Sequence, residues 1–160
     1  VASIGFLAPA GLLESRKSEV IQQFEKTGEI VLTASNREEF EKIVDVVMFK
    51  RPAFAPGFVV EAMAARAAAD QTLHQRIYKD FKSVPSDLAT ALSKSNYKGP
   101  ALIVWGKEDR VLHVDGAAEL KTAMPGFDVI LMDQVGHVPM MEKPEQVAAD
   151  YVKWREAIAK

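Results

Sequence analysis

Two short apolar runs near the end of the chain constrain its fold most strongly. Residues 101–105 (ALIVW) and 129–132 (VILM) each predict a buried β-strand, and a helical pattern lies between them over residues 115–124. A connection that contains a helix and exceeds about a dozen residues joins parallel strands. A further helix is expected over residues 144–159. The end of the chain therefore predicts two strand–helix units of a parallel sheet.

The rest of the chain predicts one more strand and a helical block. Residues 2–8 (ASIGFLA) form a continuous apolar run closed by Pro9 and Gly11, which predicts a strand buried on both faces. Helical spacing then dominates up to residue 99, with helices expected over residues 15–26, 35–48 and 57–81 and from residue 85. We expect an α/β fold in three parts: one strand in 1–11, an inserted helical block in 12–99 and two strand–helix units in 100–160.

Composition excludes several classes of protein. The chain is 48% hydrophobic and 26% charged, as in globular proteins. Its 20 basic and 22 acidic residues leave no basic excess to neutralise phosphates, so nucleic acid is not an expected partner. The lack of cysteine excludes disulfides, thiolate metal sites and a cysteine nucleophile. It leaves the compartment undetermined, with the cytoplasm as a default expectation. The longest apolar runs reach about ten residues, half of what a spanning helix needs.

A carboxylate and an imidazole follow the last two predicted strands. The segment GKEDR after residues 101–105 contains Asp109, and the segment DQVGH after residues 129–132 contains His137. Neighbouring parallel strands lie about 4.8 Å apart and end at the same edge of a sheet, so these side chains are expected to meet. A carboxylate that holds the Nδ1 proton of an imidazole leaves Nε2 free to act as a general base. The pair therefore predicts two members of a catalytic triad.

These loops resemble the acid loop and the histidine loop of the α/β-hydrolase family. The matching stretches are residues 106–111 (GKEDRV), 136–139 (GHVP) and 142–145 (EKPE), and residues 1–11 look like the family's sixth strand, after which many members insert a helical cap. The cap and residues 40–52 resemble bacterial lipases and esterases most. The resemblance covers essentially the whole chain. It implies an ester hydrolase in which Asp109 orients His137, and His137 acts as base and then acid, with no metal or organic cofactor.

One part of the family's machinery has no counterpart in this sequence. The family's nucleophile lies in a Gly-x-Ser-x-Gly elbow, and none of the eight serines has a glycine two positions before it. An aspartate takes the place of the serine in some members of the family. Asp128 lies two positions after Gly126, but Ile130 stands where the second glycine of the elbow should be. The oxyanion-hole loop is not found either. The resemblance therefore implies the C-terminal half of a hydrolase, with the first strands and the nucleophile on an N-terminal half in the same or a separate chain.

The apolar stretch over residues 46–59 is a candidate binding surface for substrate. Its candidate residues are Met48, Phe49, Phe54 and Phe58. A small-molecule ester or a lipid ester is the expected substrate, with transient contact to a lipid surface. The same side chains would equally well form the core of the cap, since a helical insert must bury an apolar face.

A metal site is the weaker interpretation of the polar residues. His113 and Asp115, together with His137, could supply metal ligands, but they lack tight ligand spacing. Asp115 is instead expected to cap the helix that begins there. We predict no metal site.

Two other functions stay open. The first is a different cap-bearing hydrolase, such as a C–C bond hydrolase, a dehalogenase or an epoxide hydrolase, because the elbow that decides among them is not in this sequence. The second is a non-catalytic, hydrolase-like binding protein that uses the groove of the cap alone. In that case Asp109 and His137 are an ordinary turn residue and an ordinary loop residue.

Overall fold

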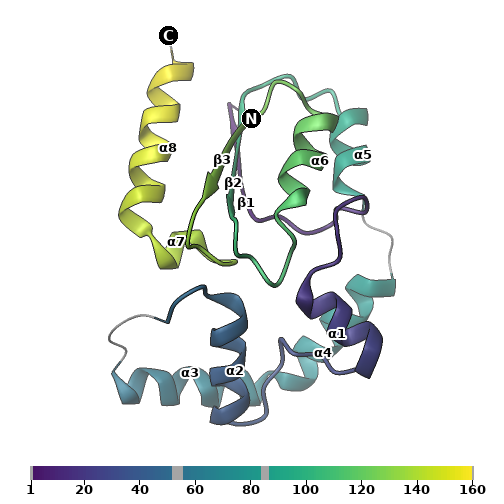
Figure 1. Cartoon of the computed structure of the whole chain (residues 1–160), viewed down its shortest axis with the longest axis vertical. Helices are drawn as coiled ribbons and strands as arrows, with labels where there is room; N and C mark the ends of the chain where they lie inside the picture. The colour runs from purple at the N-terminus through teal and green to yellow at the C-terminus, as the bar shows by residue number, and fades with distance from the viewer. Residues whose placement is uncertain (1, 52–55, 84–86, 160) are drawn as a thin grey trace.

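The computed structural model describes residues 2–51, 56–83 and 87–159 and contains one parallel sheet (Figure 1). Its strands are β1 (Ile4–Leu7), β2 (Ala101–Gly106) and β3 (Asp128–Met132), in the order β1-β2-β3. All pairs are parallel, with Phe6 opposite Ile103 and Val104 opposite Ile130. The predicted α/β class with a parallel sheet is confirmed.

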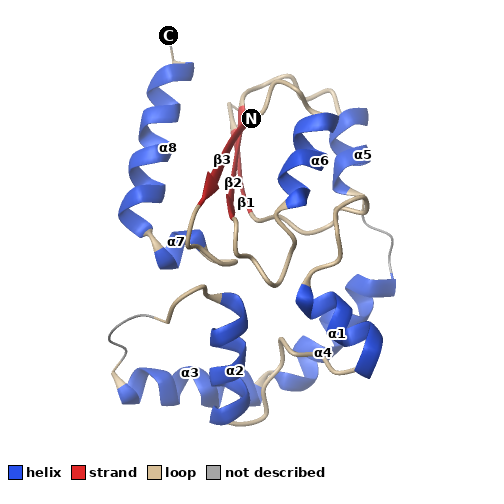
Figure 2. Ribbon diagram, viewed as in Figure 1, coloured by secondary structure: helices blue, strands red, loops and turns tan. Residues whose placement is uncertain are grey.

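Helices cover both faces of the sheet (Figure 2). On one face lie α5 (Leu88–Lys94) and α6 (Asp115–Ala123), and on the other lies α8 (Pro144–Ile158), preceded by the short α7 (Pro139–Glu142). The sequence patterns did not predict α7. In the part of the chain that the structure describes, no helix has the length and apolarity that crossing a bilayer requires.

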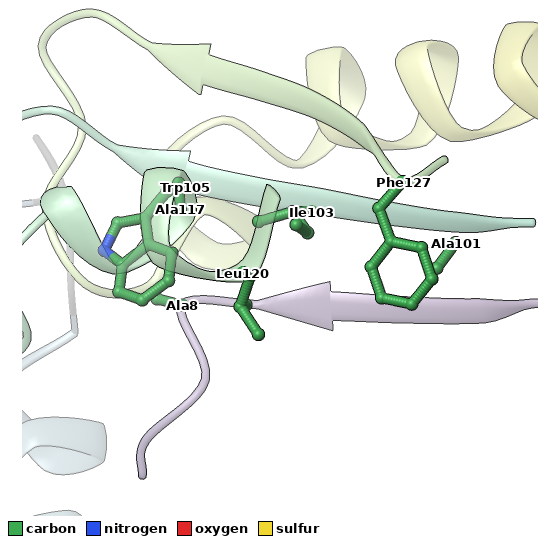
Figure 3. Packing of buried hydrophobic residues seen from close by; sticks show 7 residues of the cluster. All are labelled: Ala8, Ala101, Ile103, Trp105, Ala117, Leu120 and Phe127. Atoms are coloured by element: carbon green, nitrogen blue, oxygen red, sulfur yellow. The ribbon is translucent and has the colours of Figure 1, made fainter. Parts of the chain in front are cut away.

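The central strand β2 divides the core between the two faces because successive side chains of a strand point to opposite sides. Ile103 and Trp105 pack toward α6 with Leu120, alongside Phe127 (Figure 3). Leu102 and Val104 pack toward α8, where they meet Met132, Val135 and Trp154. All six residues of β2 are buried, so the C-terminal end of this strand is a rigid base for the loop that follows.

The first strand differs from its prediction. It is shorter than residues 2–8, and its residues alternate between half-buried and exposed instead of being buried on both faces. Ile4 and Phe6 pack against the core, whereas Leu7 is 39% exposed. The physical reason is that the described cluster under α8 includes residues of β2 and β3 but none of β1, so one face of β1 is left uncovered. The strand is also an edge strand, since it pairs with β2 and no described strand pairs with its other side.

Of the helices between β1 and β2, α5 packs on the sheet and the four before it lie at the C-terminal ends of the strands (Figure 1). They are α1 (Glu19–Thr27), α2 (Arg37–Val47), α3 (Gly57–Ala69) and α4 (Gln71–Ser83). The helix expected over residues 35–48 is capped by Asn36 and begins at Arg37. The side chain of Asn36 accepts from the N–H of Glu39, and the Glu39 carboxylate accepts from the N–H and hydroxyl of Ser35.

The prediction of one long helix over residues 57–81 is wrong, because the helix is interrupted at Asp70, between α3 and α4. Asp70 ends α3 with φ −94° and ψ 4°, and its N–H still donates to the Arg66 carbonyl. The helix α4 then packs on α1, where Tyr78 meets Phe24 edge-on with ring centroids 5.0 Å apart. Alanine-rich helical spacing contains no stop signal here, so tertiary packing decides where the helix ends.

Candidate active site

The loop after β2 holds a fully buried carboxylate. The Asp109 side chain is 0% exposed, and its Oδ1 accepts from the N–H groups of Val111 at 2.8 Å and Leu112 at 2.9 Å. Its Oδ2 accepts from the indole Nε1 of Trp105 at 3.0 Å. A buried carboxylate is tolerated only when its oxygens are hydrogen-bonded. The loop therefore holds Asp109 in one orientation.

The loop after β3 brings His137 to the same carboxylate. Nδ1 of His137 lies 2.9 Å from Oδ2 of Asp109, and the imidazole is 24% exposed. An ionised carboxylate only accepts hydrogen bonds, so this contact is a hydrogen bond in the tautomer that has its proton on Nδ1 and its free lone pair on Nε2. The geometry provides an oriented imidazole with a basic nitrogen, at the edge of the sheet where its strands end.

The acid loop and the histidine loop are joined by two hydrogen bonds between Glu108 and Val135. The N–H of Glu108 donates to the Val135 carbonyl at 3.1 Å, and the N–H of Val135 donates to the Glu108 carboxylate at 3.0 Å. Gly106 permits this approach, since a Cβ on it would lie 2.1 Å from the carbonyl oxygen of Gly136. The distance between Asp109 and His137 thus depends on a glycine that sequence reasoning gave no role.

An ion pair ties the acid loop to the helical block. The guanidinium of Arg110 contacts both carboxylate oxygens of Glu19 on α1, at 2.7 and 2.6 Å. The hydrogen bond from Arg110 holds the pKa of Glu19 below its ordinary value. Arg110 also donates to the backbone carbonyl of Asp45 on α2 at 3.0 Å. The residue next to Asp109 therefore contacts two helices of the block.

Only part of the candidate binding surface lies near this pair. Met48 and Phe49 line a cavity of about 430 Å³ together with residues 107–110, which include Asp109. Phe58 lies on α3, is 77% exposed and does not line this cavity. Phe54 lies outside the described residues. The structure thus brings two of the four candidates together with Asp109.

Asp115 and His113 have structural contacts. Asp115 is the first residue of α6, Val114 holds the N-cap position without a side-chain bond, and the predicted cap is therefore wrong. The Asp115 carboxylate pairs with Nε of Arg16 at 2.6 Å, and Nδ1 of His113 accepts from the Asp115 N–H at 3.2 Å. In the described ranges, no three acidic or imidazole side chains gather where they could hold a metal ion.

Glu142 is a site residue that sequence reasoning overlooked. Its Oε1 accepts from the N–H of Gly136 at 2.8 Å, and its Oε2 accepts from the N–H of Phe49 at 2.7 Å. Glu142 stands in the stretch EKPE that carried the family resemblance, but the pattern gave it no role. Its partner Phe49 is 93 positions away in the chain, so the contact is visible only in three dimensions.

Parallel strands with helices on both faces, and an acid–imidazole pair at their C-terminal ends, define a hydrolase-like α/β protein. The chain belongs to the α/β-hydrolase family, whose model, described as "Alpha/beta hydrolase family", matches residues 5–150. The resemblance first noted in residues 106–111, 136–139 and 142–145 is confirmed.

The similar proteins include bacterial lipases and a mammalian lipase. The chain is 31% identical over 131 residues to Lipase 3 of Moraxella sp. (strain TA144), covering 81% of this chain and 40% of that protein. It is 26% identical over 157 residues to monoacylglycerol lipase ABHD6 of Bos taurus, covering 92% of this chain and 45% of the lipase. The chain spans less than half the length of these curated relatives.

A solved structure matches the whole chain. The crystal structure of a membrane phospholipase A, described as a bacterial virulence factor, superposes with a TM-score of 0.93 at 29% identity. The match covers 100% of this chain and 50% of that one. The predicted similarity to bacterial lipases and esterases is therefore confirmed at the level of both sequence and fold.

Proposed function

We propose that this chain supplies the acid and the general base of a serine hydrolase that cleaves carboxylic esters, lipid esters among them. The observation that carries the proposal is the 2.9 Å contact between the buried Asp109 carboxylate and Nδ1 of His137. The nucleophilic serine would come from an N-terminal half, in the same or a separate chain. In support, the chain spans 40% of a bacterial lipase and 45% of a monoacylglycerol lipase.

The proposed mechanism follows from the tautomer that Asp109 imposes. Nε2 of His137 takes the proton of the serine hydroxyl while the serine oxygen attacks the ester carbonyl, and Asp109 stabilises the imidazolium that forms. His137 then gives this proton to the departing alkoxide, which leaves an acyl-enzyme. In the second half of the reaction His137 takes a proton from water while the water oxygen attacks the acyl carbon. The bond between this carbon and the serine oxygen then breaks, His137 returns the proton to the serine oxygen, and the carboxylic acid is released. Backbone N–H groups of the N-terminal half would hold the oxyanion.

The surroundings of Asp109 favour this role over that of a simple turn residue. A turn needs only the two backbone N–H groups that Oδ1 accepts. The second oxygen is aimed at the imidazole and is held there by the indole of Trp105. This arrangement reduces the reorganisation needed when His137 becomes charged, which is how a preorganised site lowers a barrier.

The substrate class rests on the cavity and on the relatives. Met48 and Phe49 give the cavity beside Asp109 an apolar wall, which suits the acyl chain of an ester. We propose that Phe58, and Phe54 outside the described residues, extend this apolar surface toward a longer chain or a lipid surface. In this proposal residues 12–99 form a helical cap inserted into a core made by residues 1–11 and 100–160, and the last helix of the insert, α5, packs on the sheet of that core.

Labelling with a serine-directed fluorophosphonate tests the proposal. The full-length protein should be labelled on one serine outside residues 1–160, and it should hydrolyse p-nitrophenyl esters. The variant His137→Ala should lose several orders of magnitude in kcat with little change in stability, because triad members act as a unit. A protein that is neither labelled nor active on esters would refute the proposal and favour another hydrolase or a binding protein.

A further inference from the structure

The last turn of α2 is held by the acid loop and the histidine loop at the same time. The helix ends at Val47, and Met48 continues in extended backbone (φ −105°, ψ 141°) without a glycine turn. Helix ends leave carbonyl groups without partners inside the helix. Arg110 donates to the Asp45 carbonyl at 3.0 Å, and the N–H of His137 donates to the Val47 carbonyl at 2.8 Å.

Glu142 connects Phe49, two residues beyond the end of α2, to the histidine loop. One of its carboxylate oxygens holds the N–H of Phe49, and the other holds the N–H of Gly136. Hydrogen bonds to an ionised carboxylate are stronger than neutral ones. Phe49 lines the cavity beside Asp109, and Gly136 immediately precedes His137. The Glu142 side chain thus holds both the backbone of Phe49, in the cavity wall, and the backbone of the residue before His137.

The backbone of Gly136 is packed tightly against the end of α2. A Cβ on Gly136 would lie 2.6 Å from the carbonyl oxygen of Val47 and 2.8 Å from the nitrogen of Phe49. Both are backbone atoms, which cannot swing away as the end of a side chain can. The end of α2 therefore rests directly on the main chain of the histidine loop, and a shift of one is transmitted to the other.

We propose that Glu142 is a positioning residue that couples the cap to His137. It keeps Phe49 and His137 in fixed relation, so that the cavity wall that selects the acyl chain and the base that moves the proton shift together. This inference rests on the proposed function, since it is expressed in ester hydrolysis. Glu142 does not touch substrate. It acts through the backbone of the two segments that it joins.

Glu142→Gln in the full-length protein tests the coupling. The amide keeps one accepting oxygen but points an NH₂ group at the other N–H, so one of the two bonds is lost. We expect kcat per titrated active site to fall by about 10- to 100-fold, as small misplacements of catalytic groups do. The ratio of kcat/KM for long-chain and short-chain esters should change as well. A purely structural role would lower the melting temperature and leave both quantities unchanged in the molecules that fold.

Glu145→Gln is the matched control. Glu145 is exposed at the start of α8, carries the same charge three positions further on and makes none of these contacts. This control should keep wild-type kinetics. Glu142→Asp retains the charge but is one methylene too short to bridge, and it gives the same test if the glutamine variant does not fold. Wild-type kcat per active site and an unchanged chain-length ratio in the Glu142 variants would overturn the inference.

Hydrogen exchange separates this inference from the proposed function. In Glu142→Gln the amides of residues 46–50 and 134–138 should exchange faster together, and in Glu145→Gln neither segment should change. If this paired change occurs while the wild-type protein hydrolyses no ester, the coupling is supported and the proposed function fails. If the wild-type protein hydrolyses esters and the two segments respond independently, the inference fails and the proposed function stands.

Discussion

Replacing Gly106 by alanine tests whether the contact between the two loops sets the geometry of the acid–imidazole pair. The new Cβ would lie 2.1 Å from the carbonyl oxygen of Gly136 and 2.2 Å from that of Val135. Ordinary contact begins at 3.4 Å, so the two backbones must separate by about 1.3 Å, the difference between 3.4 and 2.1 Å. No flexible side chain can absorb this movement.

The expected cost follows from that separation. If half of the 1.3 Å separation falls along the line between Asp109 and His137, the distance between Oδ2 and Nδ1 increases from 2.9 Å to about 3.6 Å. That distance is beyond hydrogen-bond range. We expect a loss of about 100-fold in kcat for ester hydrolysis, because misplacement on this scale has that effect. Overpacking of a buried position should also cost about 1–3 kcal/mol of unfolding free energy.

The assay compares Gly106→Ala with Gly126→Ala in the full-length protein. A Cβ on Gly126 meets nothing within 4 Å, and its φ lies outside the left-handed region, so this control should keep the wild-type kcat and melting temperature. Activity is measured on a short-chain ester per titrated active site, and stability by thermal unfolding. If Gly106→Ala matches the control in both measurements, the loops do not depend on this close approach and the reasoning is wrong.

Four further predictions concern the pair, the cap, the edge strand and the ion pair. Asp109→Asn should lower kcat by several orders of magnitude, because an amide can hold the wrong tautomer of His137; an active variant would contradict the assignment. Phe58→Asp should reduce kcat/KM for long-chain esters more than for acetate esters, whereas equal losses would assign Phe58 to the cap fold alone. A preparation of residues 1–160 alone should associate through the open side of β1 in analytical ultracentrifugation, and a monomer at all concentrations would argue against this. Arg110 lowers the pKa of Glu19, so this pair stabilises the fold above the ordinary glutamate range and the contribution is lost as pH falls through the lowered pKa. Glu19→Gln should therefore flatten the acid side of a plot of melting temperature against pH, and an unchanged slope would show that the pair contributes nothing.

The sheet and the acid–imidazole pair could be predicted because short-range signals determine them. The strand at residues 101–105 is a continuous apolar run that the structure buries completely in β2. The length of its connection to β3 sets the parallel direction, and parallel strands must bring their following loops to one edge. Asp109 and His137 each come within a few residues of a strand end, so their meeting needed no knowledge of side-chain packing.

The remaining features could not be predicted because they depend on long-range contacts. The break at Asp70 reflects the packing of α4 on α1, for which the alanine-rich segment carries no pattern. The predicted cap role of Asp115 failed because the helix begins one residue earlier than expected, with Val114 at the N-cap position, and the Asp115 carboxylate pairs with the distant Arg16. The roles of Gly106 and Glu142 likewise exist only after the loops have come together. Local patterns located the site, and tertiary contacts determine how it is held.

The contacts at the end of α2 have a consequence for how substrate preference can change. In the part of the chain that the structure describes, the hydrogen bonds that join Arg110, His137 and Glu142 to this region involve its main-chain atoms: the carbonyls of Asp45 and Val47 and the N–H of Phe49. Every amino acid except proline offers the same groups, so mutations can replace the side chains at positions 48 and 49 while the backbone stays in place. In the proposed hydrolase, mutations at these two positions can therefore change the substrate preference while Asp109 and His137 stay aligned.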